Sequence, residues 1–220
     1  MKIIVLTLLG ILFSGTSQAQ PIAELILEKT INYHDPAREW GKFNYRLFLS
    51  TEIENKEVKT TVEIDNSRGF FKSLEPDKQT EVGIEMDSCF VIQGAMDCDK
   101  IKRTRNYYLY LWGLPMKLMD AGTELDTRVK EEEFSGFSCY ILKVSYQKDV
   151  WYFFIDKSTY ALRGYRFYFD EPTNNGEVIY LENEMVISQM RIPKIRKWYR
   201  TDDGRYLGTD VLTRFEDLTE

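Results

Sequence analysis

Histidine, cysteine and proline are scarce in this sequence, which contains one His, three Cys and six Pro among 220 residues. A single imidazole excludes HExxH zinc peptidases, three-histidine zinc sites and two-histidine zinc fingers, because each needs at least two imidazole ligands. Four enzyme signatures are also missing: the G-x-S-x-G elbow, the phosphate-binding loop, the G-x-G-x-x-G fingerprint and the C-x-x-C motif. We therefore expect neither a metal ion nor a cofactor.

Positive charge is also in deficit, since 35 acidic residues outnumber 29 basic ones and the formal net charge is −6. This balance opposes nucleic-acid binding as a primary role, because nucleic acids are polyanions. Two local basic clusters, in residues 100–105 and 194–200, lie beside aromatic residues. We interpret them as solvated faces, with peripheral contact to anionic lipid headgroups as the alternative.

Aromatic residues, in contrast, are abundant, with 14 Tyr, 13 Phe and 4 Trp. Large flat side chains suit half-buried strand faces, so the composition favours β structure. The hydrophobic share of 43% and the charged share of 29% are typical of a soluble globular chain and exclude a disordered or polytopic membrane protein. The length suits one domain better than two.

The N-terminus has the pattern of a secretory signal peptide. Lys2 precedes an apolar run from Ile3 to Phe13, and small polar residues then lead to Ala19. We predict cleavage between Ala19 and Gln20, which leaves a single soluble domain over residues 20–220 in the periplasm. The alternative is a membrane anchor, but eleven apolar residues fall short of the roughly 20 that a spanning helix needs.

The cysteine spacing predicts one disulfide in that oxidising compartment. Residues 90–97 form an apolar run with Gln93-Gly94 at its middle, a signal for a two-residue hairpin loop. In that register Cys89 and Cys98 face each other at a separation that a disulfide can bridge. The alternative is two free thiols, which a one-residue slip would produce. Cys139 is expected to be buried and unpaired.

Hydrophobic periodicity predicts a mainly β fold with two helices. One helix is expected over residues 21–34, and the other over residues 100–112, ended by Gly113 and Pro115. Alternating patterns predict about ten or eleven strands: residues 42–55, 58–64, 69–72, 81–86, the cysteine hairpin, 137–146, 150–155, 160–169, 178–190, 195–200 and 205–215. Hairpin loops are expected at Asn175-Gly176 and Asp203-Gly204, the latter placing Tyr199 opposite Gly208. So many strands favour a curved, partly closed antiparallel barrel with helices on its concave side.

The second helix is apolar or aromatic on every side over residues 107–112. Such a helix must be buried or must cover something, so it is either a lid over an apolar cavity or a plug of ordinary core. A continuous cavity of several hundred cubic ångströms beneath residues 100–119 would favour the lid. Twelve residues are candidates for the cavity and its lid: Phe43, Tyr45, Leu47, Tyr108, Leu111, Trp112, Leu114, Met116, Met119, Trp151, Phe153 and Phe167.

Four segments carry a resemblance to known families: residues 33–40, 107–116, 151–167 and 192–210. The segment at 151–167 resembles the strand, Asp-x-x-Thr turn and strand of the LolA-like superfamily of periplasmic lipoprotein carriers. More closely, the chain resembles an uncharacterised family of exported proteins from Gram-negative bacteria, a domain of unknown function. The superfamily resemblance implies an unclosed β-barrel with a helical lid around an apolar cavity that binds acyl chains.

The function that we expect is non-catalytic binding or carriage of an apolar or lipidic ligand in the periplasm, with a lipid or lipoprotein acyl chain as partner. The alternative is an envelope protein–protein interaction module with a packed aromatic core and no ligand. A weaker alternative is a carboxylate-dependent hydrolase, but the acidic pairs Asp97/Asp99 and Asp202/Asp203 and the run 131–133 are interpreted as solvated turns. The oligomeric state stays open.

The single histidine has a structural interpretation. His34 lies at a predicted helix end, immediately before Asp35-Pro36. A cap or a hydrogen bond to a nearby carbonyl group is the expected role there, rather than general-base catalysis.

Overall fold

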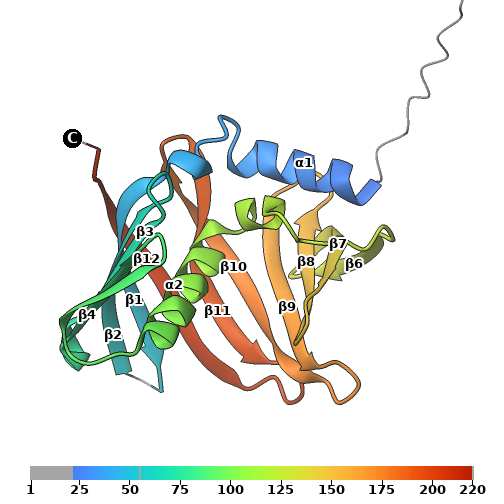
Figure 1. Ribbon diagram of the computed structural model, residues 1–220. Coiled ribbons are helices and arrows are strands. Elements are labelled where there is room, and N and C mark those ends of the chain that lie inside the picture. Colours follow the sequence, from blue (N-terminus) through green and yellow to red (C-terminus); the bar gives the residue numbers. More distant parts are fainter. Residues whose placement is uncertain (1–21, 55, 220) are drawn as a thin grey trace, which may run out of the picture.

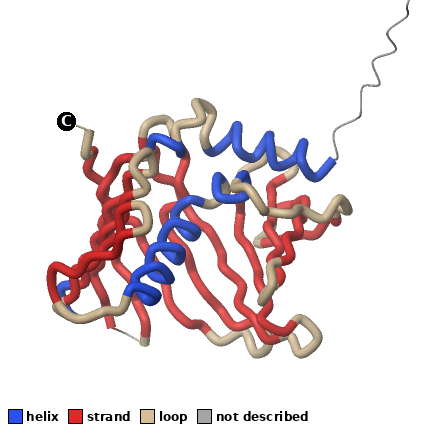
Figure 2. Tube along the Cα trace, viewed as in Figure 1, coloured by secondary structure: helices blue, strands red, loops and turns tan. Residues whose placement is uncertain are grey.

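The computed structural model describes residues 22–54 and 56–219. The predicted signal peptide and its cleavage site lie outside these residues. Among the described residues, no helix combines the length and apolar composition that crossing a bilayer requires. One sheet of 12 strands dominates the molecule, and it curves around the two α-helices without closing (Figure 1, Figure 2).

All neighbouring strands of the sheet are antiparallel, in the order β5-β4-β3-β2-β1-β12-β11-β10-β9-β8-β7-β6. The strands are β1 (Asn44–Ile53), β2 (Lys56–Asp65), β3 (Phe70–Glu75), β4 (Thr80–Glu85), β5 (Ser88–Gln93), β6 (Lys130–Phe134), β7 (Phe137–Ser145), β8 (Val150–Asp156), β9 (Leu162–Asp170), β10 (Asn175–Ile187), β11 (Met190–Arg200) and β12 (Tyr206–Asp217). The predicted curved β fold is confirmed, with slightly more strands than expected.

Two helices lie on the concave side of the sheet. The helix α2 (Cys98–Gly113) crosses this side and contacts β4, β5 and β11, and the helix α1 (Ile22–His34) lies across one end of the sheet (Figure 1). Short 3-10 helices follow α1 (η1, Trp40–Lys42), β3 (η2, Pro76–Lys78) and α2 (η3, Met116–Met119). The main core lies between these helices and the sheet. Successive side chains of a strand point to opposite faces of the sheet, and those that point toward the helices are mostly apolar.

A second, smaller core lies on the opposite face of the sheet. The ring of Phe134 stacks on Phe154 and Tyr180 with centroid distances of 4.0 and 5.0 Å. The ring also covers Gly164 of β9, which lies between Phe154 of β8 and Tyr180 of β10. Because Gly164 has no side chain, it leaves room for the ring. This arrangement explains why β8 has no polar face: Phe153 is buried inside and Phe154 is buried outside.

The predicted disulfide between Cys89 and Cys98 is present, with a Cα–Cα distance of 5.6 Å, and Cys139 is free and buried. The predicted hairpin that was to bring the pair together is wrong. Cys98 is the first residue of α2, because the Asp97 side chain caps the helix by accepting a hydrogen bond of 2.8 Å from the Lys100 backbone N–H. The disulfide therefore ties an edge strand to the start of the helix.

Two predicted loops differ from the structure. The β11–β12 loop is longer than Asp203-Gly204, with the Arg200 N–H donating to the Arg205 carbonyl group, so Tyr199 pairs with Tyr206 rather than Gly208. The second loop was predicted at Asn175-Gly176, but both residues lie within β10, and residues 171–174 form the loop.

Two further errors concern strand limits. The predicted strand 178–190 ends at Ile187, and Ser188 and Gln189 form a turn with φ of 44° and 68°. Such a turn usually contains Asn or Gly, so its sequence signal was weak. Residues 131–133, interpreted as a turn, belong to β6.

Candidate functional site

A cavity of about 470 Å³ lies between α2 and the concave face of β8–β11. This volume falls within the range of small-molecule sites, about 300–1,000 Å³. We call it the aromatic cavity and define it by the residues that line it: Tyr107, Tyr110, Leu111, Asp149, Trp151, Tyr165, Phe167, Phe169, Glu177, Ile179 and Trp198.

The floor of the aromatic cavity is apolar and follows from strand register. Tyr165 pairs with Ile179, and Ile179 pairs with Trp198, so the three side chains form one row across β9, β10 and β11. Tyr165 and Ile179 are only 1% and 3% exposed. Leu111 covers this row from α2 and is 9% exposed.

One wall consists of four aromatic rings in contact. Tyr110 of α2 meets Trp151 of β8 at a centroid distance of 5.1 Å. Trp151 stacks on Phe167 at 4.4 Å, and Phe167 meets Phe169 edge to face at 5.2 Å. Because Phe169 is 55% exposed, the wall runs from the interior to the solvent. We call these four rings the aromatic wall.

The mouth of the cavity carries two carboxylates. Asp149 accepts a hydrogen bond of 2.8 Å from the indole N–H of Trp151, which fixes the orientation of that ring. Glu177 is the cross-strand neighbour of Phe167, and its burial raises the pKa of its carboxyl group. Both carboxylates are half-buried.

The cation nearest to this pair along the strands is already engaged. Arg200 is the cross-strand partner of Glu177, but its guanidinium donates to Asp202 and Asn175. No Lys or Arg is among the lining residues. The cavity lining therefore contains two carboxylates and no basic side chain.

A buried arginine anchors α2 to the sheet beside the floor. Arg196 is 1% exposed and donates to the carbonyl oxygens of Leu111 and Pro193 at 2.9 and 2.8 Å. Its guanidinium lies 3.6 Å from the ring centroid of Trp112. A cation at the carboxyl end of a helix is favourable because the last carbonyl groups lack helical partners.

Asp210 is the cross-strand neighbour of Arg196 and offsets its charge. Burial raises the pKa of the Asp210 carboxyl group to about 6, although the Thr51 hydroxyl donates a hydrogen bond of 2.6 Å to it. Together these groups form a polar cluster within the sheet interior.

The twelve candidate residues occupy three different environments. Leu111, Trp151 and Phe167 line the aromatic cavity. Eight pack in or against the main core and do not line the aromatic cavity: Phe43, Tyr45, Leu47, Tyr108, Trp112, Leu114, Met116 and Phe153. Met119 lies elsewhere, exposed beside a second pocket. Whether any of the twelve contacts a ligand stays a prediction.

Eight lining residues were not singled out from the sequence: Tyr107, Tyr110, Asp149, Tyr165, Phe169, Glu177, Ile179 and Trp198. One signal was available for β9, because Tyr165, Phe167 and Phe169 alternate and therefore share a face. Nothing comparable was available for the acidic pair, since the cross-strand position of Glu177 depends on the loop before it.

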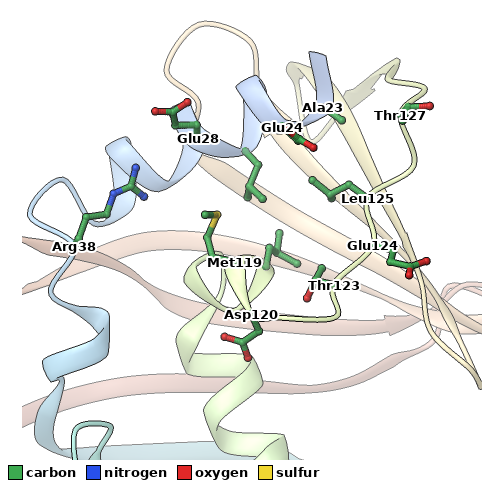
Figure 3. Close-up of a pocket in the computed structure, with 12 residues that line it drawn as sticks. Ala23, Glu24, Glu28, Arg38, Met119, Asp120, Thr123, Glu124, Leu125 and Thr127 are labelled. Atoms are coloured by element: carbon green, nitrogen blue, oxygen red, sulfur yellow. The ribbon is translucent and has the colours of Figure 1, made fainter. Parts of the chain in front are cut away.

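The second pocket has a volume of about 690 Å³ and lies between α1 and the segment 118–127. In Figure 3, Met119 and Leu125 point into the space below α1, whereas Asp120 and Glu124 point away from it. Glu24 and Glu28 lie along its α1 side, with Arg38 at the end of the pocket (Figure 3). Its lining mixes charged and apolar groups, so it is a weaker candidate for an apolar ligand.

His34 is held by the fold on both sides of its ring. Its Nδ1 lies 2.6 Å from the Arg191 carbonyl oxygen, and its Nε2 accepts a hydrogen bond of 2.9 Å from the Leu162 backbone N–H. Burial lowers the pKa of the imidazole to about 4. The expected structural role of His34 is confirmed, and neither nitrogen is free for general-base catalysis.

Comparison with known families identifies the family of this chain. A model of a family of unknown function, DUF6503, matches residues 74–217, which include every residue that lines the aromatic cavity. The chain belongs to this family. No curated protein matches the chain.

Solved structures share the fold at low sequence identity. A LolA superfamily protein from Nitrosomonas europaea has a TM-score of 0.55 and 12% identity over 90% of this chain and 94% of its own. A DUF1329 family protein from Desulfovibrio piger has a TM-score of 0.52 and 10% identity, covering 91% and 95%. A domain from Vibrio parahaemolyticus, described as an outer membrane lipoprotein-sorting protein, has a TM-score of 0.52 and 12% identity, covering 90% and 94%. The DUF6503 chain therefore has a LolA-like fold.

Proposed function

We propose that this DUF6503 protein is a non-catalytic binding or carrier protein for an apolar or lipidic ligand, and that the ligand occupies the aromatic cavity. The observation that carries the proposal is the cavity itself, which is preformed, walled by aromatic rings, floored by Tyr165, Ile179 and Trp198, and covered by Leu111 of α2. Preformed concave sites of this size with a few polar groups are typical of small-molecule binding.

The shared fold supports the same proposal. One structural neighbour belongs to the LolA superfamily and another is described as a lipoprotein-sorting protein. An acyl chain is an apolar ligand of the shape that a narrow aromatic cavity accommodates. We therefore propose that the ligand is a lipid or a lipoprotein acyl chain and that the protein binds it in the periplasm.

Export is part of this proposal. The disulfide between Cys89 and Cys98 is compatible with an oxidising compartment. The N-terminal sequence has the features of a signal peptide, with Gln20 as the first mature residue. Mass analysis of the protein from the envelope fraction should give a mature chain that begins at Gln20, and an intact Met1 there would contradict export by cleavage.

A titration with a fluorescent probe that joins an acyl chain to an uncharged head group tests the binding function. Two phenylalanines provide a matched pair, since Phe169 is 55% exposed and lines the cavity, whereas Phe137 is 39% exposed and does not line it. We expect the wild type to bind the probe, Phe169→Ala to weaken binding about three- to tenfold through lost apolar contact, and Phe137→Ala to leave it unchanged.

Native mass spectrometry of protein taken from the periplasm provides a second measurement, in which a co-purified lipid would be seen directly. A wild type that binds no acyl probe and carries no lipid would refute the carrier proposal. Equal losses in both phenylalanine variants would show that the probe binds outside the aromatic cavity.

A specific observation favours the interaction module as the second candidate. The outer side of α1 exposes Ile22 and Leu25, which are 58% and 41% exposed. Large contiguous apolar patches are typical of protein-interaction surfaces, and a patch centred on these two side chains is what this candidate requires. This candidate predicts that replacing both residues with Ser lowers binding to an envelope partner and leaves probe binding unchanged.

A further inference from the structure

The charge pattern of the aromatic cavity points to the polar end of its ligand. Its lining contains two carboxylates, Asp149 and Glu177, and no basic side chain. An anionic head group at this mouth would meet two like charges in a half-buried, weakly screened site. A cationic head group would find complementary charge instead.

The aromatic wall adds a second attraction for a cation. Ring faces attract a cation within about 6 Å of the ring centroid, and aromatic enclosures recognise quaternary ammonium groups in this way. The described residues form nine cation–π pairs, and none of the nine involves Tyr110, Trp151, Phe167 or Phe169. The faces of this wall are therefore not already engaged by a cation of the described chain.

The order of groups along the cavity determines how such a molecule enters. Tyr165 and Ile179 of the floor are buried, whereas Phe169 and Tyr107 are 55% and 45% exposed at the opening. Glu177 lies beside the wall, as the cross-strand neighbour of Phe167. An apolar tail therefore fits toward the floor, and the charged head fits between the carboxylates and the outer rings.

Two positive side chains of β11, Arg196 and Arg200, lie near this arrangement, and each has a neighbouring carboxylate; Lys148, which precedes Asp149 in the chain, is exposed and does not line the cavity. Arg200 is bound to Asp202, and Arg196 lies beside the floor, with Asp210 as its cross-strand neighbour. Trp112 and Leu111 also engage Arg196 from the side of α2. Neither cation reverses the sign of the charge at the mouth.

We infer that the ligand of the aromatic cavity is a cationic amphiphile, whose ammonium head binds between Asp149 and Glu177 against the aromatic wall. This inference rests on the proposed binding function, because it assigns the head group of the ligand in the same cavity.

Three twelve-carbon probes that differ only in the head group test the inference: dodecyltrimethylammonium, dodecanoate and dodecan-1-ol. Each is titrated into the full mature chain, the two ionic probes below their micellar concentrations and dodecan-1-ol below its solubility limit, with tryptophan fluorescence and calorimetry as readouts. We expect dodecyltrimethylammonium to bind at least about tenfold more tightly than dodecanoate, which corresponds to about 1.4 kcal/mol.

The variant Asp149→Asn/Glu177→Gln removes both charges and keeps the shape of each side chain, including an oxygen that accepts from the Trp151 indole. It should reduce the preference for dodecyltrimethylammonium over dodecanoate to less than about threefold. Asp87→Asn/Glu133→Gln is the matched control, because both residues are exposed and neither lines the cavity. The control should retain the full preference.

The outcomes separate the two proposals. If dodecanoate binds as tightly as the ammonium probe, or if the neutralised variant keeps the full preference, the cationic assignment is wrong while the binding function stands. If none of the three probes binds, the proposed function fails together with the inference.

Discussion

Acidification should destabilise this protein through its one histidine. Neutral His34 is buried and uses both ring nitrogens, and the Nε2 atom accepts the Leu162 N–H. Protonation of Nε2 removes that hydrogen bond and places a charge in the core. The pKa is accordingly lowered from 6.5 to about 4 in the folded state.

The sign and size of the effect follow from this difference. The unfolded chain binds a proton near pH 6.5 and the folded chain only near pH 4, so the contribution of His34 is full above pH 6.5 and is lost as the pH falls to 4. Between pH 7.5 and pH 4.5 the loss amounts to about 2.5 kcal/mol of unfolding free energy.

Asp210 acts in the opposite direction over part of this range. Its pKa is raised to about 6, so the folded carboxyl group retains its proton at a pH where the unfolded one has lost it. Its contribution is therefore present below about pH 4 and is lost as the pH rises to 6. The pH profile of the wild type alone mixes the two groups.

A comparison with His34→Gln isolates the histidine. Urea denaturation of both proteins from pH 7.5 to pH 4.5 should show the stability advantage of the wild type shrinking by about 2.5 kcal/mol. The imidazole NMR signal gives an independent pKa, free of overlap because the chain has one His. A folded-state pKa near 6.5, or an advantage that does not change with pH, would refute the reasoning.

Three other perturbations have defined outcomes. Trp112→Ala should cost about 3–5 kcal/mol in urea denaturation, because the side chain is 1% exposed in the core; a loss below about 1 kcal/mol would instead support a mobile lid. Replacing Cys89 and Cys98 with Ser should cost about 2–3 kcal/mol by the same measurement, and thiol counting that finds three alkylatable cysteines in unreduced protein would contradict the disulfide. Gly164→Ala should lower the melting temperature by several degrees, because its Cβ would lie 2.4 Å from a Phe134 ring carbon; an unchanged melting temperature would mean that the ring moves freely.

The fold was largely predictable because buried apolar residues alternate with more exposed residues along the strands. In β1, Leu47 and Leu49 point inward and are buried, whereas Arg46 and Ser50 on either side are polar; Phe48 is the apolar exception on the outer face. The observed pairing with β2 follows from this alternation. The start of α2 was not predictable in the same way. Asp97 is equally suited to a hairpin end and a helix cap, and only the packed structure distinguishes the two uses.

The site was less predictable than the fold. Leu111 and Trp112 are adjacent and both apolar, yet one lines the aromatic cavity and the other fills the core. The difference depends on the rotation of α2, which the Arg196 contacts hold in place from β11. A local pattern indicates that a residue is buried, but it does not indicate whether the neighbouring space is filled.

The strand order also has a consequence for the course of folding. The pair β1 and β12 joins residues as distant as Tyr45 and Asp217, whereas every other neighbouring pair in the sheet is consecutive in the chain. Two local meanders can therefore form early, and their union must wait for β12, because contacts over long sequence separations form slowly. Until then β1 and β11 are unpaired edges, which are templates for association with other chains. A nascent chain in which β12 is delayed is thus the form of this protein with the greatest need of a chaperone.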